Sequence, residues 1–355
     1  MKKICLLVTA LMLTGLSIKA QDIHFSLYGE APSVINPALT GVAYDLRANV
    51  NYKTQWKSFN SAYKTYAGNF EASLKHEKMT KAYMAAGINF YKDVAAGSKS
   101  DSKFTTTGIS ANFCTVITTG KNSKLSLGLT GGANSRNIKQ YDSLTWENQY
   151  DGFKYDPSRP TGEADESRYS FSNADFGGGV NWHYSESNLY ISSNNGSRFD
   201  IGASVYHFNS PKNTFYSFGD DKLNMRYNGY ANAVFCFKES NICFAPGVLY
   251  QQQGANREIV TSALIRVILK QQSVHTKEEK PSAFSGGFQY RFKDALIPTF
   301  LFEYDKYAIG LAYDINLSKL TTASKSKGGF EFALRYNWNP GYGKMVGNST
   351  SGASH

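Results

Sequence analysis

The sequence predicts an all-β protein, a transmembrane antiparallel β-barrel of about 14 strands. Residues 306 to 317 and 328 to 338 alternate between apolar side chains and polar or small ones. Because successive side chains of a strand point to opposite faces, each segment has one apolar and one polar face. Each is about as long as the roughly 9 to 11 residues with which a tilted strand crosses a bilayer.

The N-terminus indicates which membrane is involved. Lys2 and Lys3 precede an apolar run that ends at Leu16, and Ala20 precedes Gln21. This pattern is typical of a secretory signal peptide, predicted over residues 1–20. Beyond it there is no long apolar run, and the mean hydropathy is −0.39, which argues against membrane helices. A barrel also satisfies every backbone polar group in lipid, so we expect a bacterial outer-membrane protein.

The domain organisation follows from the spacing of the alternating segments. We predict a periplasmic N-terminal segment over residues 21–43, the barrel over 44–339 and a flexible tail over 340–355. The longest connection, residues 139 to 173, is acidic and is expected to be extracellular, because periplasmic turns are usually short. The predicted strands lie near 44–54, 62–74, 82–92, 104–117, 125–138, 174–184, 198–208, 224–238, 242–251, 257–269, 283–293, 295–304, 306–317 and 328–338.

The same alternation predicts which polar side chains face the lumen. Barrels of about eight strands are filled, and those of about 16 to 18 leave a channel, so this lumen could be open, narrowed or plugged. The glycine run from Gly177 to Gly179 favours a strand in which small side chains let something pack closely. The predicted lumen residues are Asp45, Arg47, Asn49, Asn51, Lys53, Asn69, Glu71, Gln289, Arg291, Asp314, Glu331 and Arg335.

The sequence carries little sign of enzyme chemistry. The six histidines lack metal-ligand spacing, and neither a Gly-x-Ser-x-Gly motif nor a phosphate-binding loop occurs. His183 and His207, near strand ends, have no serine or acid placed beside them by a motif. Basic residues do not interleave with aromatic ones as in nucleic-acid-binding proteins. We therefore expect no catalytic residue, no cofactor, no metal and no nucleic-acid partner.

Two cysteines are predicted to meet. A tight turn would place Cys236 opposite Cys243, both on the lumen face. Directly opposed strand residues have Cβ atoms about 4.5 to 5.5 Å apart, farther than the roughly 3.8 Å of a disulfide. Proximity is therefore predicted, and the disulfide itself stays open. Cys114 would leave an odd cysteine in the processed chain.

Three N-terminal blocks resemble a known family. They are Gln-Asp-Ile-His-Phe-Ser-Leu-Tyr from Gln21, Asn-Pro-Ala-Leu-Thr-Gly from Asn36, and Asn-Tyr-Lys-Thr-Gln-Trp from Asn51. Together with Gly310 to Asp314 near the end, these blocks resemble the PorP/SprF family of type IX secretion system outer-membrane proteins of Bacteroidetes. Ile23, Leu27 and Lys53 depart from the family's usual Pro, Gln and Arg.

The resemblance implies a non-enzymatic partner in exporting and anchoring a large surface protein, such as a gliding adhesin. Its implied partners are periplasmic type IX secretion or motility components, the C-terminal domain of the secreted protein, and outer-membrane lipid. Two alternatives stay open, a porin or solute channel and a soluble secreted β protein with an apolar interior. The candidate residues for partner binding or for plugging the barrel are Asp22, Phe25, Tyr28, Asn36, Pro37, Gln55 and Trp56.

Overall fold

The computed structural model describes residues 22–55, 63–74, 81–96, 103–139, 146–162, 170–186, 196–215, 220–237, 239–270, 280–318 and 326–338. The predicted signal peptide, the tail from residue 340 and Trp56 lie outside these residues.

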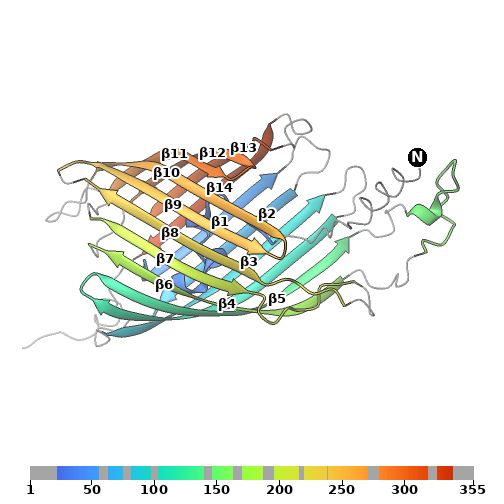
Figure 1. The fold of residues 1–355 in the computed structure, drawn as a ribbon, viewed down its shortest axis with the longest axis horizontal. Helices are drawn as coiled ribbons and strands as arrows, with labels where there is room; N and C mark the ends of the chain where they lie inside the picture. Colours follow the sequence, from blue (N-terminus) through green and yellow to red (C-terminus); the bar gives the residue numbers. More distant parts are fainter. Residues whose placement is uncertain are drawn as a thin grey trace, which may run out of the picture.

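Fourteen strands form a closed antiparallel barrel (Figure 1), which confirms the predicted fold. Each observed strand overlaps one predicted segment, and the ends differ by at most four residues. The strands are β1 (Leu46–Gln55), β2 (Tyr63–Ser73), β3 (Ala82–Ala96), β4 (Lys103–Gly120), β5 (Ser123–Lys139), β6 (Ser170–Ser185), β7 (Arg198–Tyr206), β8 (Arg226–Cys236), β9 (Ile242–Gln253), β10 (Asn256–Lys270), β11 (Ser282–Arg291), β12 (Ala295–Tyr304), β13 (Tyr307–Asn316) and β14 (Lys327–Trp338).

Each strand pairs with its neighbours in the sequence, and the barrel closes where β1 pairs with β14. Lys53 lies opposite Glu331 at this seam. We call the end at which odd-numbered strands finish the loop end, because it carries the long connection between β5 and β6. The other end, where β1 begins, is called the base. Two of the turns at the base have only two residues each, 121–122 and 305–306.

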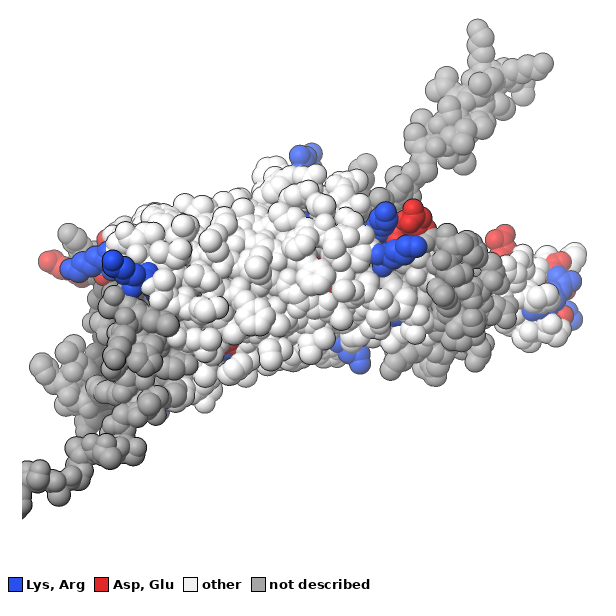
Figure 2. All heavy atoms as spheres, turned by 90° about the horizontal axis from the view of Figure 1, so that it is seen from below, with Lys and Arg blue, Asp and Glu red and all other residues white. Residues whose placement is uncertain are grey.

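The outer face of the barrel is apolar. Ile109, Leu129 and Phe288 are each about 60% exposed or more, which is typical of side chains that face lipid. Figure 2 shows charged side chains gathered at the two ends and a mostly uncharged band between them. The predicted lumen side chains are buried, except that Asp45 is partly buried.

The lumen is occupied by residues 22–44, which we call the plug. It contains the short helices η1 (Tyr28–Glu30), α2 (Pro32–Ile35) and η2 (Pro37–Leu39). Proline begins both α2 and η2, where a backbone N–H would have no helical partner. These helical turns lie inside the ring of strands (Figure 1).

The position of the plug differs from the sequence prediction of a periplasmic segment. Asp22 contacts Gln253 near the loop end, and the chain then runs through the lumen to β1 at the base. The physical reason is that the wall supplies hydrogen-bond partners and apolar contacts to this segment along its length. Among the described residues, no helix is long and apolar enough to span a membrane.

Replacing an outward-facing leucine by arginine should cost more stability in the lipid-facing band than at the end of the barrel. Leu311, in the middle of β13, faces outward, and Leu317 lies just beyond the same strand. We expect Leu311→Arg to lower the free energy of unfolding by about 2 to 4 kcal/mol, and Leu317→Arg by about 0 to 1 kcal/mol. Denaturant titration of the refolded barrel in lipid vesicles measures both. Equal losses at the two leucines would contradict the assigned membrane band.

Candidate functional site

The N-terminal half of the plug is held by buried charges at the barrel seam. The Glu331 carboxylate accepts hydrogen bonds from the backbone N–H groups of Ser26 and Leu27 at 2.8 and 2.9 Å. It also pairs with the Lys53 ammonium at 2.8 Å, and each of these two charged side chains is 1% exposed. The carboxylate therefore joins β1, β14 and the plug.

A second group of charges binds the same segment. The Arg291 guanidinium donates to the Ser26 hydroxyl at 2.6 Å and to Asp314 at 2.9 Å, and that hydroxyl donates to Asp314 at 2.9 Å. The Arg335 guanidinium donates to Glu30 at 2.7 Å. Most of the charged wall side chains that bind the plug therefore also form ion pairs with one another.

The C-terminal half of the plug presents backbone carbonyls to polar wall side chains. The Ile35 carbonyl accepts from Ser204 at 2.5 Å and from Asn228 at 2.8 Å. Because a buried backbone group without a partner is costly, these contacts allow irregular chain to occupy the lumen. Further donor and acceptor pairs are Tyr206 to Ser33, Arg226 to Val34, Ser126 to Ala38, Tyr83 to Gly41 and Lys124 to Val42.

The turn at Asn36 packs most closely against the wall. Its side-chain oxygen accepts from the Ala38 N–H at 2.9 Å and so caps η2. Its side-chain amide donates to the Val180 carbonyl at 2.9 Å and to the Tyr230 hydroxyl at 3.1 Å. An added Cβ at Gly179 would collide with Asn36, so the glycine run predicted to allow close packing receives this turn.

Apolar contacts fix the plug on several sides. Leu27 packs on Ala295 and Ile297, and Tyr28 and Ile35 pack with Leu249, Val260 and Tyr230. Val42 packs on the β3 and β4 side, and Phe25 on Ala67 of β2. The wall strands that the plug contacts are therefore spread around the barrel.

Asp22 forms a charged cluster with the wall at the loop end. His207 lies between the Asp22 carboxylate, on its Nε2, and the Asp175 carboxylate, 2.7 Å from its Nδ1. Arg226 approaches Asp22 at 3.3 Å. Burial opposes the charged imidazolium, but the two carboxylates outweigh it and raise the pKa of His207 to about 9. Burial likewise opposes ionisation of Asp22, but His207 and Arg226 hold the pKa of that carboxyl well below its usual range.

The structure brings most of the candidate residues together. Asp22, Phe25, Tyr28, Asn36 and Pro37 all lie in the plug, and the last four are buried. Gln55 lies apart from them at the end of β1, opposite Gly329 of β14. Trp56 falls outside the described residues.

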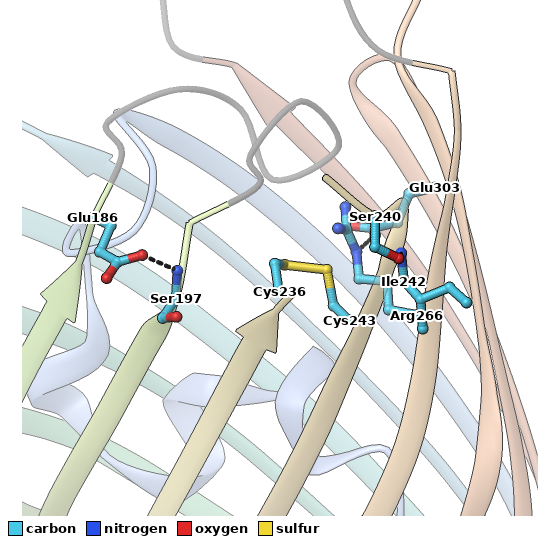
Figure 3. The surroundings of a disulfide bond; sticks show 8 residues. All are labelled: Glu186, Ser197, Cys236, Ser240, Ile242, Cys243, Arg266 and Glu303. Atoms are coloured by element: carbon cyan, nitrogen blue, oxygen red, sulfur yellow. Dashed lines mark hydrogen bonds and ion pairs between the residues drawn. A yellow bond between two sulfur atoms is a disulfide. The ribbon is translucent and has the colours of Figure 1, made fainter. Parts of the chain in front are cut away.

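The cysteine pair closes the turn between β8 and β9 at the base (Figure 3). Cys236 and Cys243 are opposed in register, have Cα atoms 4.0 Å apart and form a disulfide. Arg266 and Glu303 lie beside it (Figure 3) and pair at 2.9 Å. Cys114 is a free, buried thiol whose Sγ donates to the carbonyl of Ala38 in the plug at 3.5 Å.

Four polar wall residues that bind the plug were not among the predicted lumen residues. Ser126, Ser204, Asn228 and Tyr230 sit on inward positions of β5, β7 and β8, so the strand alternation carries a signal for them. Nothing in the local sequence links His207 to Asp22, 185 residues away. Among the described residues, no cluster of three or more histidine, cysteine or acidic side chains is arranged to hold a metal ion.

A single methyl group should test how tightly the plug is seated. Gly128 lies opposite Cys114, and a Cβ there would collide with the backbone of Pro37 and Ala38. We expect Gly128→Ala to shift the plug and raise the rate at which a maleimide labels the Cys114 thiol at least tenfold. Mass spectrometry of the native protein measures the labelling.

Gly229→Ala is the matched control, because a Cβ at Gly229 meets no atom within 4 Å. This variant should label at the wild-type rate. Equal labelling of Gly128→Ala and wild type would show that the plug is not seated against Gly128.

The loop-end cluster predicts a pH dependence. Because the pKa of His207 is raised, its contribution to stability is full below about 6.5 and is lost as the pH rises through about 9. The loss cannot exceed about 1.4 kcal/mol per pH unit for one proton. We expect thermal unfolding of wild type to show this loss between pH 6 and 10 and His207→Asn to lack it. Parallel curves for the two proteins would contradict the assignment.

The fold was compared with solved structures. It resembles the toluene transporter TbuX of Ralstonia pickettii, with a TM-score of 0.48, 11% identity, and 88% of this chain and 94% of that chain covered. It also resembles a BamA structure from Haemophilus ducreyi, with a TM-score of 0.42, 12% identity, and 83% and 70% covered. We draw no functional conclusion from these likenesses.

The sequence was compared with family models and with curated proteins. The curated proteins gave no match. The model described as "Type IX secretion system membrane protein PorP/SprF" matches residues 17–336. Together with the closed barrel, this match places the protein in the bacterial outer membrane. The chain belongs to the PorP/SprF family of type IX secretion system membrane proteins.

Proposed function

We propose that the protein is an accessory barrel that helps export and anchor one large secreted surface protein, such as a gliding adhesin. Family membership supports a role in type IX secretion. The observation that carries the proposal is the plug, which contacts strands on several sides of the lumen. A barrel filled in this way suits a holder of a client better than a conduit for one.

The orientation that we propose follows the usual asymmetry of outer-membrane barrels. Their periplasmic turns are short and their extracellular connections are long, which favours an extracellular loop end and a periplasmic base. The C-terminal domain of the client would then contact the long connections. Periplasmic type IX secretion or motility components would contact the turns at the base. Neither role requires catalysis.

The burial of the N-terminal motifs supports a plug role for them over direct docking. Phe25 and Tyr28 are 3% and 7% exposed, and Asn36 is 0% exposed. A partner at either end of the barrel could not reach these side chains while the plug is seated. The partner surfaces are therefore better sought in the connections at the two ends.

Deletion of the gene in its native bacterium tests the proposal. We expect surface display of one secreted protein to be lost while other type IX substrates still reach the surface. A plasmid copy of the wild-type gene or of Gly229→Ala should restore display. Surface proteomics with whole-cell protease shaving measures the outcome. Normal display of every surface protein, with loss of uptake of a small solute, would favour a porin or solute channel instead.

A further inference from the structure

A cavity of about 270 Å³ remains in the lumen beside the plug. It lies toward the base, since its wall includes Arg198, the first residue of β7, and Arg266 and Glu303 near the ends of β10 and β12. Its volume is close to the lower limit of about 300 Å³ for small-molecule sites.

One part of the cavity surface is apolar. Leu27, Ile35, Leu39 and Val42 of the plug line it on one side. On the other side, Val234, Leu264 and Leu301 face inward from β8, β10 and β12 and are only partly buried. Inward positions of this barrel otherwise carry many polar side chains, and other inward apolar residues, such as Leu249 and Ile297, are fully covered by the plug. These three apolar side chains, on alternate strands of the wall, provide a surface for an aliphatic group.

One arginine beside the cavity, Arg198, is not held in an ion pair with any described residue. Arg266 and Arg335 both pair with Glu303, at 2.9 and 3.0 Å, and Arg335 also pairs with Glu30 at 2.7 Å. Arg47 pairs with Glu71 at 2.7 Å, and the Asp200 carboxylate is hydrogen-bonded to the Nδ1 of His183 at 2.7 Å. The Arg198 side chain makes no hydrogen bond or ion pair within the part of the chain that the structure describes, although its charge acts on Tyr44 and Glu303.

A further polar atom near the cavity lacks a partner. Tyr44 lines the cavity and is 5% exposed, and its hydroxyl has no hydrogen bond among the described residues. The Arg335 guanidinium lies 5.8 Å from the centre of its ring. Because buried polar groups are usually satisfied, an unpaired hydroxyl beside an unpaired cation indicates a site for a bound acceptor.

We propose that this cavity binds a small amphipathic anion, a carboxylate with an aliphatic chain. The carboxylate pairs with Arg198, and the chain lies against Val234, Leu264 and Leu301. Affinity should depend on both the charge of Arg198 and the apolar surface. An inorganic anion would use only the charge, and a neutral hydrocarbon would use only the apolar surface. This inference needs no secreted client and stands apart from the proposed function.

Binding of radiolabelled decanoate to the full-length protein in lipid nanodiscs tests the proposal, with empty nanodiscs subtracted. We expect one saturable site. Arg198→Gln should weaken decanoate binding about tenfold to a hundredfold, the value of a hydrogen bond to a charged group. Arg257→Gln, which changes an exposed arginine at the loop end, is the matched control and should leave the affinity unchanged.

Three further measurements separate the charge from the apolar surface. Decanol should bind wild type no better than decanoate binds Arg198→Gln, and Arg198→Lys should retain part of the decanoate affinity. Leu264→Trp should fill the cavity and remove binding of both compounds, with a heat-modifiable band on gels showing that the barrel is folded. No saturable site in wild type, or equal losses in Arg198→Gln and Arg257→Gln, would overturn the proposal.

Discussion

The structure depends on one constraint: an irregular segment inside a closed barrel must find partners for its backbone polar groups. Glu331 meets this need for two N–H groups, and wall side chains meet it for carbonyls between Ser33 and Val42. A carboxylate that is 1% exposed also needs a counterion, and Lys53 on the adjacent strand provides it. The lumen charges are therefore part of how the plug is held.

This arrangement couples the plug to closure of the barrel. The plug immediately precedes β1, yet Glu331 and Arg335, which bind it, belong to β14, the last strand. The seam between β1 and β14 therefore brings together both halves of the site that binds Ser26 and Leu27. The plug is thus joined covalently to the first strand and bound noncovalently by the last. Loss of the Glu331 carboxylate would weaken the seam and the plug together.

Much of the barrel was predictable from the sequence because a strand carries its own signal. The period of two predicted every strand and the lumen side of residues such as Asn69 and Arg291. The plug has no such period, and its contacts join residues that are far apart in the sequence. Asn36 and Val180 are separated by 144 residues, and Ser26 and Glu331 by 305. The cavity at Arg198 could not be predicted from the sequence either, because it is the part of the lumen that the plug does not fill. The signals for the plug were the glycine run around Gly179 and the plugging role considered for the N-terminal blocks.

Removing the plug would be costly, and this bears on how the protein works. Withdrawal would expose Phe25, Leu27, Tyr28, Ile35 and Val42 to water, each at a cost of about 1.5 to 3 kcal/mol. Together these come to on the order of 10 kcal/mol, as much as the whole stability of many domains. Water would resolvate the polar wall groups but would not offset this apolar loss. A partner that drew the plug out would have to bind it with comparable strength, so contacts at the two ends of an intact, filled barrel are the more economical way to hold a client.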